Sequence, residues 1–267
     1  MNRLHARPAL LSGGLLSGAF SGALAAGMIL AGTAHAQGVE APANSVLAPS
    51  PPPASEGTPP SGYAWGGGWM SNHYAGAYGG GMLALNPNRS LWEDGFAVRG
   101  DISAGRYSYN AIDRHVGLFD GDLLVGYRKA TEAGNFGGYV GVAHIKHDNN
   151  DPAARLRGSK TGVAVLGEYS NTINKKVEVN LQGRYAEPFS SWSVSGRALW
   201  KMGDYQWFGP QVSFLRNDDY KEMTVGPLLK TMTSFGEVGL SGGWRHPIDS
   251  NNKDGYFASV YVAVPIR

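Results

Sequence analysis

Most of this chain alternates apolar and polar residues with a period of two, and no stretch shows the 3.6-residue period of an amphipathic helix. In residues 95–109, for example, Phe96 and Ile102 lie on one face of the extended chain, and Arg99 and Asp101 lie on the other. Such alternation is typical of antiparallel strands with one apolar and one polar face. The sequence therefore predicts an all-β fold.

Two all-β architectures explain the alternation. In a soluble sandwich the apolar faces form the core, whereas in a membrane barrel they contact lipid and the polar faces line the lumen. The predicted strands are about 10 residues long, which suits tilted crossings of a bilayer. Aromatic residues stand at strand ends, where barrels carry interfacial girdles: Tyr127, Tyr169, Tyr185, Trp192, Trp200, Trp244 and Tyr256. We therefore expect a closed, antiparallel up-and-down transmembrane β-barrel.

The spacing of the alternating segments indicates how many strands the barrel has. Eleven segments are clear in the sequence: 74–85, 95–109, 120–130, 137–147, 158–170, 176–186, 192–202, 205–216, 220–232, 236–245 and 255–264. A bacterial barrel with both ends in the periplasm needs an even number of strands. We predict about twelve, with residues 63–70 as the first strand, and ten remains the alternative if weak segments merge.

The connections between these segments support the same count. Short turns are expected at 131–135, 171–175, 203–204 and 233–235, and mostly longer, polar connections at 110–119, 148–157, 217–219 and 246–254. Short periplasmic turns that alternate with longer outer loops are typical of outer-membrane barrels.

The first residues have the features of an export signal. In residues 1–36 a basic start precedes an apolar, small-residue segment and an A-x-A cleavage pattern that ends at Ala36; an uncleaved membrane anchor is the alternative. Residues 37–62 are rich in Pro, Ala and Ser and are predicted to be a disordered tail. The barrel is then expected over 63–267, in the outer membrane of a Gram-negative bacterium and in contact with its lipid.

Charged residues of both signs fall on the predicted inner faces. A charged side chain that faces lipid at the bilayer midplane costs roughly 2–4 kcal/mol, so these residues are expected to point inward. The polar lumen candidates are Arg99, Asp101, Asp122, Arg128, His144, Lys146, Lys160, Glu168, Glu178, Gln182, Arg184, Arg197, Glu237 and Arg245. They form either a salt-bridged lumen that stiffens a narrow barrel or a polar path for a neutral glycan.

Aromatic residues on the polar faces are candidate stacking surfaces for sugar rings. They are Trp207, Tyr107, Tyr109 and Tyr261. The alternative is that these rings pack in the interfacial girdle or against loops.

Two arrangements resemble catalytic sites. Residues 239–243 match G-x-S-x-G, but a nucleophile elbow needs a strand–turn–helix context, and Ser241 lies inside a predicted strand. His144, with His147 and Asp148, ends a strand at the predicted outer rim, where it is a candidate base of an outer-membrane hydrolase or a solvated loop residue. We expect the protein not to be an enzyme.

Composition excludes several other kinds of site. The chain has no Cys, which rules out disulfides and Cys-based metal centres. Residues 148–151 carry possible Ca²⁺ ligands but lack EF-hand spacing, so we expect no metal and no cofactor. The formal charge of +2 gives no case for a nucleic-acid partner.

The strand and turn patterns resemble one protein family. The segments GFAVRGDISAGRYSYN (95–110), FDGDLLVGY (119–127), GGYVGVAHIKHD (137–148), RLRGSKTGVAVLGEYSN (155–171) and WSVSGRALWKMGDYQWFGPQVSFLRNDDY (192–220) are similar to the bacterial cellulose biosynthesis protein family BcsS. The resemblance covers roughly residues 75–267, and the chain departs from other outer-membrane barrels at Arg267, where an aromatic residue is common.

The resemblance implies a role in cellulose biosynthesis. It implies a non-enzymatic outer-membrane barrel that assists export or surface placement of the glucan, with cellulose and cellulose synthase subunits as partners and with no catalytic residues. Three other functions remain open from the sequence: a general small-solute or oligosaccharide porin, an outer-membrane hydrolase with a rim His/Asp site, and a structural barrel with a plugged lumen.

Overall fold

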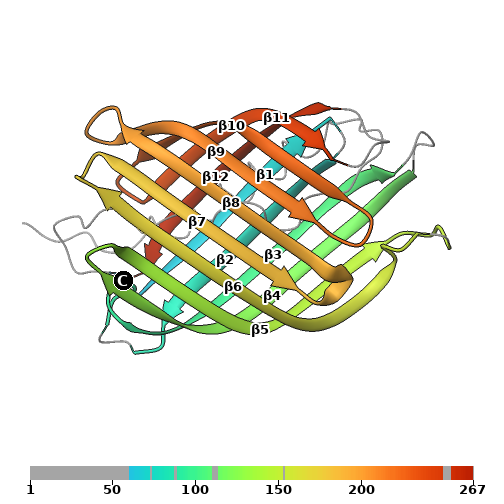
Figure 1. Cartoon of the computed structure of the whole chain (residues 1–267), viewed down its shortest axis with the longest axis horizontal. Helices are drawn as coiled ribbons and strands as arrows, with labels where there is room; N and C mark the ends of the chain where they lie inside the picture. The colour runs from blue at the N-terminus through green and yellow to red at the C-terminus, as the bar shows by residue number, and fades with distance from the viewer. Residues whose placement is uncertain are drawn as a thin grey trace, which may run out of the picture.

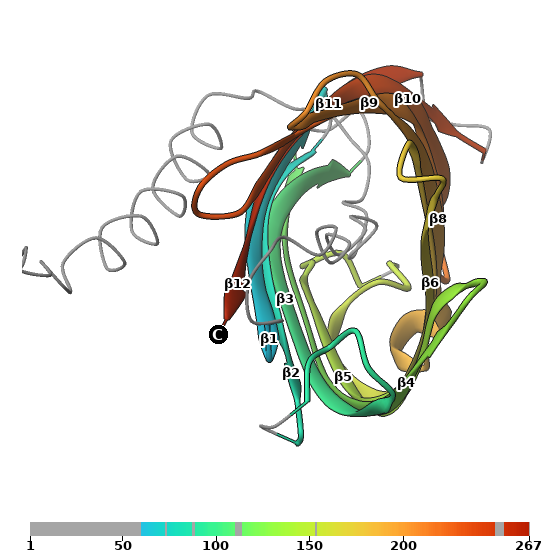
Figure 2. The same ribbon diagram turned by 90° about the vertical axis from the view of Figure 1, so that its left-hand side faces the viewer.

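The chain forms a closed antiparallel barrel of twelve strands in a computed structural model, which describes residues 60–266 apart from 73, 87–88, 110–113, 153 and 249–253 (Figure 1). The strands are β1 (Gly62–Ser71), β2 (Tyr74–Ala84), β3 (Gly95–Tyr109), β4 (Arg114–Thr131), β5 (Gly134–Asp148), β6 (Gly158–Ile173), β7 (Val177–Ala186), β8 (Ser191–Lys201), β9 (Gln206–Arg216), β10 (Lys221–Met232), β11 (Glu237–Pro247) and β12 (Gly255–Ile266). Each strand pairs with its neighbours in sequence, and β1 pairs with β12, which closes the ring seen in Figure 2.

The prediction of twelve strands is confirmed, and the alternatives of ten strands and of a soluble sandwich are wrong. The first strand begins at Gly62, one residue inside the predicted tail. The predicted signal peptide (1–36) and almost all of the predicted tail (37–62) lie outside the described residues. Among the described residues, no helix is long and apolar enough to cross a membrane.

The two ends of the barrel differ in their connections. We call the end where β1 begins and β12 finishes the termini end, at the left of Figure 1, and the opposite end the far end. Short turns at 132–133, 174–176, 202–205 and 233–236 lie at the termini end, as predicted. The longer connection over 85–94 also lies there, which the alternation of short and long connections did not predict.

One expected loop is largely strand. The sequence predicted a long connection over 110–119, but β4 begins at Arg114. The reason is that the period of two continues upstream of the predicted strand, with Val116, Leu118 and Asp120 all buried on the inner face. Strands β3 to β6 are therefore longer than the other strands of the barrel.

The outer surface is apolar around the barrel. Leu123 is 66% exposed, Phe96 62% and Val142 54%, although all three lie in the middle or at the start of strands. Exposed aromatic residues form two outward bands: Phe96, Tyr127, Phe136, Trp200 and Phe208 toward the termini end, and Phe119, Tyr185, Phe214, Trp244 and Tyr256 toward the far end. The tilted stretch of β8 between Trp192 and Trp200 spans about 20 Å, close to the height of the apolar band of an outer-membrane barrel.

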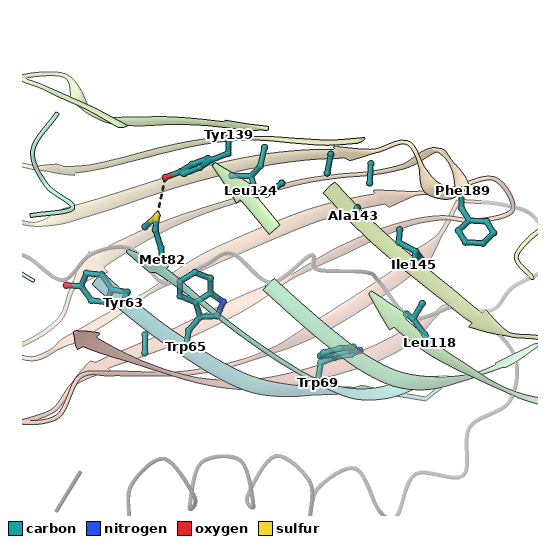
Figure 3. Packing of buried hydrophobic residues seen from close by; sticks show 14 of the residues in the cluster. Tyr63, Trp65, Trp69, Met82, Leu118, Leu124, Tyr139, Ala143, Ile145 and Phe189 are labelled. Atoms are coloured by element: carbon teal, nitrogen blue, oxygen red, sulfur yellow. Dashed lines mark hydrogen bonds between the residues drawn. The ribbon is translucent and has the colours of Figure 1, made fainter. Parts of the chain in front are cut away.

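The inner surface combines aromatic and polar residues. Tyr63, Trp65 and Trp69 of β1 point inward and are buried. Figure 3 shows these rings in one interior cluster with Met82 and Tyr139, whose hydroxyl lies 3.1 Å from the Met82 sulfur. The interior is therefore filled from β1 and β2 by large rings, and the charged side chains of the other strands pack against them.

Candidate functional site

The lumen is the candidate functional site, and the structure places most of its predicted residues there. The inward-pointing, buried residues are Arg99, Asp101, Tyr107, Asp122, Arg128, Glu178, Gln182, Arg184, Arg197, Trp207, Glu237 and Arg245. Glu168 also points inward and is half-buried. Lys160 shares the inward face but is exposed at the far end, and the side chain of Tyr109 lies outside the described residues.

A first ion network joins β3, β4, β5 and β6. Glu168 accepts hydrogen bonds from Arg99 at 3.0 Å and from Arg128 at 2.5 Å. Arg99 also donates to Asp101 at 2.6 Å, and the Tyr139 hydroxyl donates to Glu168 at 2.8 Å. One carboxylate thus bridges two guanidinium groups that come from different strands.

A second network crosses the lumen between strands that do not pair. Arg184 of β7 donates to Asp122 of β4 through two nitrogens, at 2.6 and 2.7 Å, and to Asp120 at 3.1 Å. Side chains of Arg184, Asp120 and Asp122 are at most 1% exposed. A fully buried bidentate pair of this kind fixes the distance between the two strands.

A third network lies toward the termini end on the opposite wall. Lys230 of β10 contacts Glu178 of β7 and lies 3.4 Å from Glu237 of β11. Arg197 of β8 donates to Glu178 at 3.3 Å and to the Tyr261 hydroxyl of β12 at 3.2 Å. The network therefore ties together β7, β8, β10, β11 and β12.

A fourth network lies toward the far end. Arg245 of β11 and the Tyr220 hydroxyl both donate to Glu222 of β10, and the Tyr74 hydroxyl of β2 reaches Glu222 at 3.4 Å. Burial raises the pKa of Tyr220, in the β9–β10 connection, above its usual value. Its hydroxyl consequently stays protonated and able to donate to the carboxylate.

Several members of these networks escaped the sequence analysis. They are Tyr74, Asp120, Tyr139, Tyr220, Glu222 and Lys230. A signal was present for three of them: Asp120 stands two residues before Asp122, and Glu222 and Lys230 share the even-numbered inward face of β10. Continuing the period of two through each whole strand would have found them.

The aromatic candidates have their ring faces or hydroxyls occupied by protein groups. Lys230 Nζ lies 4.9 Å from the ring centre of Trp207, and Lys201 Nζ lies 5.8 Å from it. The Tyr107 hydroxyl lies 3.1 Å from Nδ1 of His147. These contacts favour the packing interpretation of both rings over a free surface for stacking sugars.

Two predicted lumen residues lie on the other side of the wall. His144 and Lys146 share the outward face of β5 with Val142, so their assignment to the lumen was wrong. The period of two continues to the far end of β5 with buried Ala143, Ile145 and His147 on the inner face. At this end of β5 the outward face is polar rather than apolar, because it lies beyond the apolar band, toward the far end.

The two arrangements that resemble catalytic sites, around His144 and Ser241, form hydrogen-bond contacts with neighbouring strands. His144 Nδ1 lies 2.7 Å from the Thr161 hydroxyl, and Nε2 lies 3.0 Å from the Ser159 hydroxyl, on the outer face of β6. Ser241 points inward and lies 2.9 Å from the Ser259 hydroxyl of β12. The described residues contain no cluster of His, Asp or Glu that fits a metal ion.

The described part of the lumen is densely packed. One small cavity within it is lined among others by Trp65, Arg99, Gln182 and Arg184. Long side chains from β4 and β7, from β8 and β12, and from β2 and β10 meet across the interior. Such an interior suits a stiff, salt-bridged barrel better than a wide aqueous channel.

Comparison with known proteins gives one family. The sequence model of the family described as cellulose biosynthesis protein BcsS matches residues 63–266. No curated protein matches the chain.

Three solved barrels are similar to this chain at low identity. The KdgM porin is 9% identical with a TM-score of 0.47, over 77% of this chain and 99% of the porin. The KdgM porin in complex with disordered oligogalacturonate is 10% identical with a TM-score of 0.36, over 77% and 99%. The transport unit of the autotransporter AIDA-I from Escherichia coli is 11% identical with a TM-score of 0.34, over 92% and 98%. These values are too low to carry a function to this chain.

Proposed function

Since the chain belongs to the cellulose biosynthesis protein BcsS family, we propose that it is a non-enzymatic outer-membrane barrel that helps to place exported glucan at the cell surface. The match covers the barrel from β1 to the end of β12. The proposal therefore concerns the barrel residues.

The distribution of charge supports an outer-membrane location. The charged groups of the four networks point inward, while Leu123, Val142 and Leu240 stand exposed on the outside. In water this outer surface would be a large apolar patch, which soluble proteins rarely expose. In a bilayer the same surface is in its preferred environment.

The packed lumen favours a supporting role over conduction of the polymer. An extended glucan passing through the barrel would have to displace buried ion pairs such as Arg184 with Asp122 and Lys230 with Glu178. Leaving either partner unpaired is costly. The surfaces left for glucan or for cellulose synthase subunits are the rims and the connections at each end.

The test is a deletion in a cellulose-producing host, with cellulose measured separately at the surface and in the periplasm. We expect surface cellulose to fall while the periplasmic pool rises. Unchanged amount and location of cellulose would contradict the proposal.

Complementation of the deletion strain with a lumen variant tests whether the glucan depends on the rim or on the lumen. Arg184→Lys keeps the positive charge in the lumen but loses the bidentate contact, so a barrel that still assembles should restore surface cellulose. If an assembled Arg184→Lys barrel fails to restore it, the lumen itself serves the glucan.

A further inference from the structure

The connection between β7 and β8 turns into the far mouth of the barrel. Pro188–Ser190 form a short 3-10 turn in which Phe189 has φ 54° and Ser190 has φ 47°. Both values lie in the left-handed region that residues with a Cβ avoid. Despite this strain, the Phe189 ring is only 1% exposed, so its surroundings hold it in place.

Contacts from β5 and β6 hold the ring. The His147 ring meets it edge-on at 4.8 Å and 88°, and the Lys160 Nζ lies 4.3 Å from its centre. His147 is held in turn by the Tyr107 hydroxyl of β3. Figure 3 shows Phe189 at the end of the interior cluster, beyond Ile145.

The neighbouring β9–β10 connection is fastened to the same turn. The backbone N–H of Asp218 donates to the carbonyl of Phe189 at 3.0 Å. Asp219 accepts from the backbone N–H of Arg155 at 3.1 Å. Connections from two separate parts of the far rim therefore meet at Phe189.

We propose that Phe189 partly covers the far mouth from the β5–β6 side, where its contacts lie, and swings out when its turn relaxes to a right-handed conformation. Lys160, which the sequence analysis assigned to the lumen, is part of the seat on which the ring rests. This cover is separate from the first and third ion networks, which lie toward the termini end.

The test uses the absence of Cys from the natural chain. Ser193→Cys places a single thiol on the inner face of β8, where Ser193 is 5% exposed and lies inward of the turn. A membrane-impermeant maleimide is added from outside to cells that carry this variant. We expect adding Phe189→Ala to speed labelling of the introduced thiol about tenfold, because the mouth is then open for more of the time.

Two further variants, each combined with Ser193→Cys, make the result decisive. Ser190→Gly relieves strain while keeping the ring, so it should slow the labelling. Phe119→Ala removes an outward ring near the same end and should leave the rate unchanged. Equal rates with and without Phe189→Ala in folded barrels, or faster labelling with Ser190→Gly, would overturn the proposal.

Discussion

At the residue scale, the interior depends on single guanidinium groups that each serve several carboxylates. Arg184 is the only described cation that hydrogen-bonds Asp120 and Asp122. Asp120 already has one buried oxygen without a hydrogen-bond partner. The charge balance of this pair of aspartates therefore rests on one side chain.

Arg184→Ala should destabilise the folded barrel by about 3–5 kcal/mol, because it leaves two buried carboxylates unpaired. Adding Asp120→Asn and Asp122→Asn to it should recover part of the loss. Urea unfolding of the barrel in liposomes measures both. A triple variant that is no more stable than Arg184→Ala alone would contradict the idea that unpaired charge causes the loss.

Gly239 is a second residue with a specific requirement. A Cβ at this position would lie 1.9 Å from the ring of Tyr261, whose hydroxyl accepts a hydrogen bond from Arg197 and donates one to Glu237. Gly239→Ala should cost about 1–3 kcal/mol through overpacking. Gly167→Ala, where a Cβ meets nothing within 4 Å, is the matched control and should be nearly neutral. Similar unfolding midpoints for the two variants would contradict this account of the glycine.

At the element scale, the strands present apolar outer faces, and on some of them, such as β5, that face becomes polar toward the far end. On β4, Leu123 is the most exposed apolar residue of the strand and lies between Phe119 and Tyr127. On β5, the outward face passes from Val142 to His144 and Lys146. The boundary of the apolar band therefore lies near the far ends of these strands.

Leu123→Arg should cost about 2–4 kcal/mol, because the charge then faces lipid near the midplane. His144→Arg, on the polar part of the outer face, is the control and should cost much less. The measurement is the free energy of unfolding from liposomes. Equal costs would place the band elsewhere or show that the outer face does not contact lipid.

The position of the chain termini predicts which end of the barrel faces outward. An epitope inserted in the β5–β6 connection, after Asn149, should be detected on intact cells, whereas one inserted at Asn174 in the β6–β7 turn should not. The prediction follows because the chain termini of an even-stranded barrel lie on the periplasmic side. Surface detection of the epitope at Asn174, and not of the one after Asn149, would show that the barrel has the opposite orientation.

At the scale of the whole molecule, ring closure and the four networks fill the described part of the lumen with long side chains. The purified protein in planar bilayers should conduct far less than an open porin of the same strand number, because long side chains fill the lumen. Steady, large conductance of the unmodified protein would contradict this and favour the porin alternative.

The period of two is a local property, so the sequence alone determined most of the architecture. It predicted twelve strands, the outward aromatic residues and the inward position of residues such as Arg99, Glu178 and Arg197. It failed where the polarity of an outer face changes, as at His144 and Lys146. There, polar no longer means inward, because the strand has left the apolar band.

Only the tertiary structure decided which inward residues meet. Arg184 pairs with Asp122, and Tyr74 reaches Glu222, across strands that are not neighbours. Ring closure and the stagger of the strands set these distances, and neither is written in a local pattern. The inward turn of Phe189 is of the same kind, because contacts from β5 and β6 hold a backbone conformation that its own sequence disfavours.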